Sequence, residues 1–411
     1  MTTYTVKARV FIVLTVFSFL FAIPVALSGC ASDSTPTADV ADLPAEPAYP
    51  SVPVNPDPAD FTKSAIDFVA ELGAGWNLGN TLDAWGSSGL SSETSWGQPM
   101  TTAKMMTDLK SSGITTVRIP VSWHNHVDEA FTVDKAWMAR VKTVVDYALD
   151  AGLFVIVNVH HDNEADFYYP DAAHKARSLE YARRVWKQIA LQFRNYDERL
   201  VFELLNEPRL VGSANEWNWS DSDPKLVAAA GIIGELEQVA LDEIRESGSN
   251  NASRYVMITP YVASPWAALS GHFAIPTDAA TDKLILSVHA YTPYVFAMQD
   301  PGDTVLTAAH KDDIDTFMGQ LNAKFVVGKN MPVVIGEYGA TNKNNLSDRV
   351  AWFSYYVGKA SSYGMATVLW DNGNWEVPPS GKYNELYGFF NRNSGTWYFP
   401  TILSAILDAV D

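Results

Sequence analysis

From residue 61 onward, short apolar segments alternate with longer amphipathic segments along the chain. This alternation is typical of repeated β-α-β units, and it predicts a parallel sheet with helices packed against it. Each apolar segment is followed by polar or turn-forming residues that mark its end. The predicted strands are Ala74–Asn80, Thr115–Pro120, Phe154–His160, Leu200–Glu207, Tyr255–Thr259, Leu284–Tyr291, Val333–Tyr338 and Ala366–Asp371.

The segments between these strands carry helix signals. Thr101 or Thr102 can cap a helix that Gly113 closes, and Asp134 can cap the next one, which ends before Gly152. Apolar residues at helical spacing indicate the remaining helices. These are a helix containing Leu179, Ala182, Val185, Ile189 and Phe193, and helices over residues 225–248, 307–325, 347–364 and 399–410.

Only the connection after the fifth strand is weak, because residues 265–269 allow a short helix at most. Strands with helices between nearly all of them favour a (β/α)8 TIM barrel. An open doubly wound sheet would need a glycine-rich phosphate-binding turn after its first strand. Residues 73–80 contain glycines but lack the spacing and the following acidic residue of that turn. We therefore predict an α/β fold with a single catalytic TIM-barrel domain over residues 59–411.

The N-terminus carries the signals of an exported protein. Basic residues precede an apolar stretch from Val10 to Leu27, which leads into Ser28-Gly29-Cys30. This string resembles the bacterial lipobox, and we predict a lipoprotein signal peptide over residues 1–29 with Cys30 as the lipidated first mature residue. An uncleaved membrane anchor or an ordinary cleaved signal, which would give a secreted protein, are the alternatives. Cys30 is the only cysteine, so no disulfide can form within one chain.

Residues 30–58 are dominated by Ala, Pro, Asp, Ser and Thr and show no apolar periodicity. We expect them to form a flexible linker that gives the domain reach from a membrane. Ala31 follows the cysteine in place of the aspartate that retains lipoproteins at the inner membrane in some bacteria. Anchoring to the outer membrane or the cell surface is therefore permitted.

Composition narrows the class of substrate. The chain has 29 basic and 47 acidic residues, a net charge of −18 that would repel a nucleic acid. Aromatic residues make up 12% of the chain, and aromatic faces suit sugar rings. An uncharged substrate fits both observations, and we expect a monomer with no nucleic-acid partner.

The chemistry is indicated by two carboxylates, Glu207 and Glu337, at the ends of the fourth and seventh predicted strands. These strand ends face each other across the mouth of a closed barrel. Two carboxylates about 5 Å apart support double displacement at an acetal without a metal or an organic cofactor. The acid of the pair would hold its proton through burial or a negative neighbour, and the nucleophile would stay ionised; Arg118 can supply positive charge near Glu337, and Tyr291 can donate a hydrogen bond to it.

Other interpretations concern neighbouring residues. Glu203 precedes Glu207 on the same predicted strand, and we expect it to be a paired structural carboxylate in the barrel core. His160, His161 and Asp162 are adjacent metal-binding residue types, but the first strand supplies only amides as further ligands, so we predict no metal. Several tryptophans can be sugar platforms or parts of a buried rim, and the sequence leaves both open: Trp123, Trp266, Trp375 and the Trp217–Trp219 segment.

Taken together, the motifs resemble those of glycoside hydrolase family 5 cellulases, over the whole of the predicted catalytic domain. The matching segments are Gly75–Asp83, Ser95–Pro99, Arg118–Pro120, Val159–Asp162, Asn206–Pro208, His289–Tyr291, Gly336–Gly339 and Trp370–Gly373.

The resemblance implies a role for each site residue. Glu207 would be the acid/base and Glu337 the nucleophile, with Trp370 as the platform under the sugar ring. Asn80 and Trp96 are further candidates for substrate contact. The residues that would line the cleavage subsite are Arg118, His160, Asn206, His289 and Tyr291.

The implied activity is that of a retaining endo-β-1,4-glucanase acting on internal bonds of cellulose, mixed-linkage glucan or xyloglucan. A β-mannanase or xylanase on the same fold is one alternative. A surface glycan-binding lipoprotein without catalysis is another, although both glutamates are present.

Overall fold

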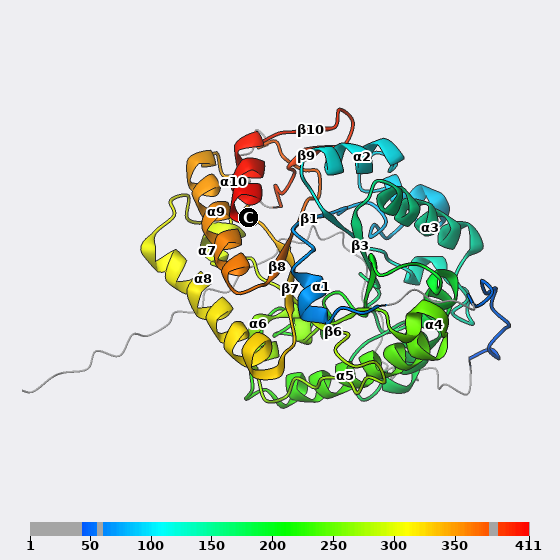
Figure 1. Ribbon diagram of the computed structural model, residues 1–411. Coiled ribbons are helices and arrows are strands. Elements are labelled where there is room, and N and C mark those ends of the chain that lie inside the picture. The colour runs from blue at the N-terminus through cyan, green and yellow to red at the C-terminus, as the bar shows by residue number, and fades with distance from the viewer. Residues whose placement is uncertain (1–42, 56–60, 378–384, 411) are drawn as a thin grey trace, which may run out of the picture. The chain divides into compact units, whose positions relative to one another are not determined.

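The computed structural model describes residues 43–55, 61–377 and 385–410. In this part of the chain eight strands close into a barrel in sequence order, and every neighbouring pair is parallel (Figure 1). The predicted (β/α)8 barrel is confirmed. Its strands are β1 (Ala74–Asn77), β2 (Thr116–Ile119), β3 (Phe154–Asn158), β4 (Leu200–Glu203), β5 (Val256–Ile258), β6 (Leu284–His289), β7 (Val333–Tyr338) and β8 (Ala366–Leu369).

Helices surround the barrel, as Figure 1 shows. The longer ones agree with the predicted helices to within a few residues, and the connection after β5 holds only a short helix, as expected. They are α2 (Ala103–Ser111), α3 (Lys135–Asp150), α4 (Lys175–Phe193), α5 (Pro224–Glu246), α6 (Pro265–Leu269), α8 (Ala308–Leu321), α9 (Leu346–Ser362) and α10 (Pro400–Val410). Two further short helices are α1 (Ala65–Val69) and α7 (Tyr294–Ala297), and a small hairpin is formed by β9 (Phe390–Asn391) and β10 (Thr396–Trp397).

The helix starts are fixed by the expected side-chain caps. Thr102, rather than Thr101, accepts a hydrogen bond from the backbone N–H of Met105 at the start of α2. Asp134 accepts from the N–H of Trp137 at the start of α3. Such caps satisfy backbone donors that the first helical turn leaves unpaired.

All the strands except β7, which ends at Tyr338 as predicted, end earlier than the apolar pattern predicts. The prediction that the fourth strand runs to Glu207 is wrong, because the ladder of β4 stops at Glu203. The next two carbonyls leave the ladder: that of Leu204 accepts from the indole N–H of Trp186, and that of Leu205 accepts from the Thr259 hydroxyl. Glu207 therefore lies on a turn beyond the strand, held by side-chain bonds that an apolar pattern does not reveal.

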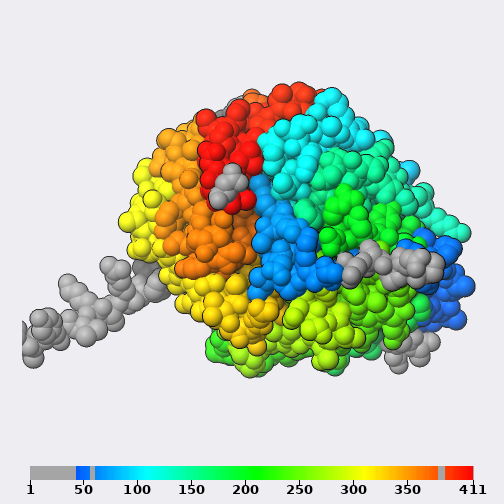
Figure 2. Space-filling view, viewed as in Figure 1, coloured from blue at the N-terminus to red at the C-terminus, as the bar shows by residue number. Residues whose placement is uncertain are grey.

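The helix α1 packs against the N-terminal ends of the strands, where its apolar residues join those that the strands point inward. Phe68 of α1 stacks on Tyr255 with ring centroids 3.9 Å apart, and the backbone N–H of Ala65 donates to the carbonyl of Asp282, just before β6. In Figure 2 the blue N-terminal part of the described chain, which includes α1, covers the centre of this face. One end of the barrel is thus closed by apolar packing, and the opposite end is left for polar residues.

Residues 43–55, which belong to the predicted linker 30–58, follow a defined path along α4. Glu46 forms ion pairs with Arg183 and Lys187 of this helix. The carbonyl of Pro44 accepts a hydrogen bond from Arg184, and that of Pro53 accepts one from Asn195. We call this segment the strap.

The remaining N-terminal predictions concern residues that the structure does not describe. The signal peptide 1–29 and the lipidated Cys30 both lie outside the described residues. Within the described residues, none of the helices combines the length and the apolar character needed to cross a membrane.

Candidate active site

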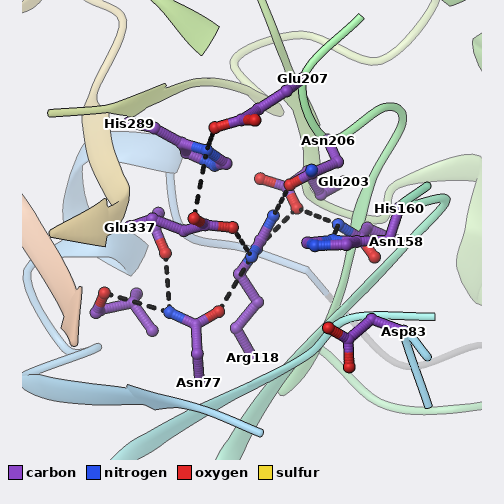
Figure 3. Close-up of polar contacts among 12 residues, drawn as sticks. Asn77, Asp83, Arg118, Asn158, His160, Glu203, Asn206, Glu207, His289 and Glu337 are labelled. Atoms are coloured by element: carbon purple, nitrogen blue, oxygen red, sulfur yellow. Dashed lines mark hydrogen bonds and ion pairs between the residues drawn. The ribbon is translucent and has the colours of Figure 1, made fainter. Parts of the chain in front are cut away.

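Arg118 of β2 organises the polar residues at the C-terminal ends of the strands (Figure 3). Its guanidinium is fully buried and donates to four acceptors on other strands and turns. Nε donates to Glu203 at 2.7 Å, and Nη1 donates to Glu337 at 2.8 Å and to Asn77 at 2.9 Å. Nη2 donates to Oδ1 of Asn206 at 2.7 Å. One rigid fork therefore fixes side chains from β1, β4, β7 and the turn after β4.

Glu203 is fully buried and paired, as expected for a structural carboxylate. Besides Arg118, it accepts from the amide of Asn158 at 2.8 Å and from the hydroxyl of Ser287 at 2.6 Å. These bonds neutralise a charge that burial alone would make costly.

Glu207 and Glu337 come together at the mouth of the barrel, with His289 of β6 between them. One carboxylate oxygen of each glutamate and a ring nitrogen of His289 all lie within 4.8 Å of one another. Nδ1 of His289 is 2.8 Å from Oε1 of Glu207 and 3.6 Å from Oε2 of Glu337. This separation of the two carboxylates is close to the ~5 Å of retaining glycosidases and shorter than the inverting range.

Both oxygens of Glu337 have hydrogen-bond donors. Oε1 accepts from Arg118, and Oε2 accepts from the hydroxyl of Tyr291 at 3.0 Å. Burial nevertheless raises the pKa of Glu337 above its usual value, against the opposing charges of His289 and Arg118. The side chain is 7% exposed.

The pKa values of Glu207 and His289 are shifted in opposite directions. Burial raises the pKa of Glu207, but the hydrogen bond and charge of His289 outweigh burial and lower it below the usual value. Burial lowers the pKa of His289, yet the charges of Glu337 and Glu207 raise it overall. The imidazole, 2.8 Å away, is thus the more basic of the two groups, and the role of Glu207 as the acid stays a prediction.

The bond from Arg118 to Oδ1 of Asn206 fixes the orientation of that amide. Its carbonyl end is occupied, so its NH₂ end is the group that remains to donate to a ligand. Asn206 is 2% exposed and precedes Glu207 directly in the chain.

His160 and Trp370 form a stacked pair beside the carboxylates. Their rings are nearly parallel, at 3°, with centroids 6.0 Å apart. Burial lowers the pKa of His160 well below its usual value, so the ring is neutral, and Nδ1 accepts from Asn158. A Cβ at Gly79 would lie 2.9 Å from Cζ2 and Cη2 of Trp370, so a glycine at 79 gives the indole its space.

The two remaining predicted contacts lie on the β1–α2 connection. The ring of Trp96 packs on His161 at 5.7 Å and edge-on to the half-exposed Trp85 at 6.2 Å. Asn80 adopts a left-handed conformation with φ 55°, and its backbone N–H donates to Asp83. Both side chains are partly exposed, and Trp96 is joined to His160 through the ring of His161.

The structure separates the tryptophans whose role the sequence left open. Trp123 is buried, with its indole N–H donating to the carbonyl of Asn158, and is therefore part of the core. Trp217, Trp266 and Trp375 are 58%, 51% and 38% exposed. Burial is excluded for these three, and a platform role remains open to them.

Sequence reasoning missed the residues that support the site. Asn158 and Ser287 bind Glu203 from β3 and β6, and Arg209 donates to the carbonyl of Glu207 at 3.0 Å. For Asn158 and Ser287 the sequence did carry a signal: each is a polar residue inside an otherwise apolar strand. A buried strand tolerates such a residue only when its side chain has a hydrogen-bond partner.

Two groups of residues could in principle supply metal ligands in the described part of the chain. One is Glu207, His289 and Glu337; the other is Asp83 with His160 and His161. In the first group, Arg118 and Tyr291 already donate to both oxygens of Glu337, which favours proton chemistry over metal ligation.

The comparisons with known proteins agree with this geometry. A family model described as cellulase (glycosyl hydrolase family 5) matches residues 81–376. The chain belongs to glycosyl hydrolase family 5. Endoglucanase B of Ruminococcus albus is 41% identical over 84% of this chain and 81% of its own length. Endoglucanase A of the same organism is 40% identical over 84% of this chain and 92% of its own.

Solved structures of other family 5 members superpose on the barrel. A mutant of a glycoside hydrolase 5 lichenase from Caldicellulosiruptor sp. F32, in complex with cellotetraose, has a TM-score of 0.81 and 38% identity, covering 90% of this chain and 99% of that chain. A GH5-4 broad specificity endoglucanase from Ruminococcus champanellensis with bound cellotriose has a TM-score of 0.77 and 37% identity, covering 84% and 98%. The predicted family is therefore confirmed, and the protein is a glycoside hydrolase of the cellulase type.

Proposed function

We propose that this family 5 enzyme is an endo-β-1,4-glucanase that cleaves internal bonds of β-glucans with retention of anomeric configuration. The observation that carries the proposal is the close approach of Glu207 and Glu337, within 4.8 Å at the open end of the barrel. That distance leaves no room for a water between them and the sugar, which inversion would need. Relatives named endoglucanase and lichenase support a glucan as the substrate.

In the first step an oxygen of Glu337 attacks the anomeric carbon, and the bond from that carbon to the glycosidic oxygen breaks. The leaving oxygen takes a proton from Glu207. Arg118 and Tyr291 hold Glu337 in the line of attack, and the buried setting strengthens both bonds. The products of this step are a glycosyl ester of Glu337 and a shortened glucan chain.

The proton reaches Glu207 from His289. The charge of Glu337 is the largest factor that raises the pKa of the imidazole. When Glu337 becomes an ester this charge is lost, and the affinity of His289 and Glu207 for their shared proton falls. The proton is therefore released toward the leaving oxygen as the covalent bond forms.

In the second step Glu207 removes a proton from water, and the water oxygen attacks the anomeric carbon from the side that the leaving group occupied. The bond to Glu337 breaks, and the carboxylate returns to Arg118 and Tyr291. The proton taken from water restores the Glu207–His289 couple, so both steps need only carboxylates, imidazole and water.

The residues around the carboxylates fit a sugar ring. Trp370, stacked on neutral His160, would form the platform under the ring at the cleavage point. The NH₂ group of Asn206 would donate to the hydroxyl next to the anomeric carbon. Trp96 and Asn80 would contact the next sugars on the same side.

The enzyme would act outside the cytoplasm, held to a bacterial membrane by a lipid on Cys30. The proposal rests on the N-terminal signal and on the lipobox-like end of that signal. Membrane fractionation of the wild type and of Cys30→Ala tests it: the wild type would sediment with membranes, and the variant would lose this association. Sedimentation of both alike would overturn the lipid anchor.

The enzymatic proposal is tested by product analysis on cellulose, mixed-linkage glucan, xyloglucan, mannan and xylan, with the anomer of the first product read by NMR. We expect β-configured products from glucans. Glu337→Gln should abolish turnover, and Glu207→Gln should lower it by about 10²- to 10⁴-fold. Cleavage of mannan or xylan without cleavage of glucan would overturn the assignment of the substrate. Products in the α configuration would overturn the retaining mechanism. Full activity of Glu337→Gln would overturn the assignment of Glu337 as the nucleophile.

A further inference from the structure

The segment that follows β5, residues 259–263, holds the turn of Glu207 on both sides, and we call it the clamp. On one side the hydroxyl of Thr259 donates to the carbonyl of Leu205, two residues before Glu207, at 2.8 Å. On the other side the backbone N–H of Val262 donates to the carbonyl of the proline directly after Glu207, also at 2.8 Å. Because both bonds come from one short segment, a shift of the clamp would shift Glu207.

The backbone of the clamp is strained. Val262 and Ala263 have φ angles of 49° and 51°, in the left-handed region that residues other than glycine rarely adopt. This conformation is costly for a β-branched residue such as valine, and it persists only where the surrounding structure fixes it. The clamp therefore needs contacts with other elements that hold it in place.

The start of the clamp is held by Glu237 of α5. One oxygen of its fully buried carboxyl group accepts a hydrogen bond from the backbone N–H of Thr259. The other oxygen has no hydrogen-bond partner among the described residues. Burial raises the pKa of Glu237 well above its usual value against the bond from Thr259, and the charge of Glu203 adds to this rise. The carboxyl group is therefore neutral, and it serves as an acceptor without the cost of a buried charge.

A chain of hydrogen bonds thus leads from α5 to the barrel mouth. Glu237 holds the N–H of Thr259, and the Thr259 hydroxyl holds the carbonyl of Leu205. Asn206 and Glu207 follow directly in the sequence. The alternative is that these bonds only satisfy buried polar groups. The two roles differ in one respect, because only a positioning role makes the loss of activity depend on how much the leaving group needs an acid.

We propose that Thr259 and Glu237 are positioning residues for the catalytic acid. The Thr259 hydroxyl sets the turn that carries Glu207, and the carboxyl group of Glu237 holds Thr259 in place from α5. The inference rests on the proposed function of Glu207 as acid/base. It adds a support from β5 and α5 to the bonds that Glu207 receives from His289 and Arg209.

The experiment compares two substrates. Cellopentaose has a sugar leaving group that needs a proton, whereas 2,4-dinitrophenyl β-cellobioside has a leaving group that departs without one. Thr259→Val keeps the shape of the side chain and removes the hydroxyl. It should lower kcat/KM for cellopentaose about tenfold, because a misplaced acid loses much of its effect, and leave kcat/KM for the aryl cellobioside nearly unchanged. Thr259→Ser keeps a hydroxyl and should retain most of the activity on cellopentaose.

Variants of Glu237 test the second link of the chain. Glu237→Gln is close in shape to a neutral carboxyl group and keeps an acceptor for the N–H of Thr259, so the ratio of kcat/KM between the two substrates should stay the same. Glu237→Leu removes the acceptor and should lower kcat/KM for cellopentaose selectively, as Thr259→Val does. A selective loss in Glu237→Gln, or an unchanged ratio in folded Glu237→Leu, would overturn the role of Glu237. If the leucine variant does not fold, the two Thr259 variants decide the proposal.

Thr116→Val is the matched control. The buried hydroxyl of Thr116 donates to the carbonyl of Leu72 at 2.6 Å, at the N-terminal end of β2 and away from the mouth. Its loss should lower the melting temperature without changing the ratio between the two substrates. Equal losses of Thr259→Val on both substrates, or none on cellopentaose, would overturn the proposal. Glu207→Gln tests the acid separately: if its loss is the same on both substrates, the proposed function of Glu207 fails whatever the clamp variants do.

Discussion

Nδ1 of His289 lies 2.8 Å from Oε1 of Glu207, and the imidazole rather than the carboxylate is the stronger base of the two. This relationship places the catalytic proton on a group that also senses the charge of Glu337, 3.6 Å away. The protonation of the leaving group is thus linked to the ionisation of the nucleophile through one ring.

The first prediction concerns the pH profile of kcat/KM. Activity requires Glu337 ionised, so it should fall as pH drops through the pKa of Glu337, which is raised above 4.5. Activity also requires the proton on the Glu207–His289 couple, so it should fall again as pH rises through the pKa of His289, raised above 6.5. We expect a bell-shaped profile with its maximum between these limits, measured with a soluble β-glucan.

His289→Asn provides the test of this assignment. Without the imidazole the proton can reside only on Glu207, so the alkaline limb should move to lower pH, toward the range of a carboxyl group. The other charged groups around the couple, Arg118 and Arg209, stay in place. An alkaline limb that does not move in the variant would contradict the assignment of the proton to His289.

The sequence predicted the barrel and the residues at its mouth because both depend on local patterns. Apolar strands and capped helices are short-range signals, and parallel strands bring their C-terminal ends to one edge regardless of the details. Glu207 and Glu337 could be placed on opposite sides of the mouth on this basis. The end of β4 could not be predicted in this way, because the side chains of Trp186 and Thr259, from other elements, bind the carbonyls that follow Glu203 and interrupt the ladder.

The location of the proton could not be predicted for a similar reason. It depends on distances among three side chains from β6, β7 and the turn after β4, and differences of about one ångström decide which group is the strongest base. The path of the strap was also beyond prediction. Its hydrogen bonds use the backbone carbonyls of Pro44 and Pro53, groups that every residue has, and its ion pairs join Glu46 to residues far along the chain, so the sequence carries no local pattern for them.

The second prediction concerns the space that Gly79 leaves for Trp370. In Gly79→Ala the new Cβ would lie 2.9 Å from the indole and 2.8 Å from the carbonyl of Asp371, so the ring must shift. We expect KM for cellotetraose to rise and the melting temperature to fall, since the carbonyl cannot yield easily. Point substitutions that strain a packed site cost about 0.5–3 kcal/mol.

Gly231→Ala is the matched control, because a Cβ at this position in α5 would meet nothing within 4 Å. It should leave KM unchanged and raise stability by up to about 1 kcal/mol through helix propensity. Unchanged KM and melting temperature in Gly79→Ala would show that Trp370 does not depend on this contact.

The third prediction concerns the strap. An enzyme that begins at residue 43 keeps the ion pairs of Glu46 with Arg183 and Lys187. One that begins at residue 61 loses them, together with the hydrogen bond from Arg184 to the carbonyl of Pro44. We expect the shorter enzyme to melt at a lower temperature, by about 2–4 °C for each kcal/mol lost. Its kcat should be unchanged, because the strap contacts the outside of α4 and not the barrel mouth. Glu46→Gln in the longer enzyme should give a smaller decrease in melting temperature that shrinks at high salt, since these partly exposed ion pairs are screened. Equal melting temperatures for the two truncations would mean that the strap adds no stability, and that residues 43–55 act only as a tether.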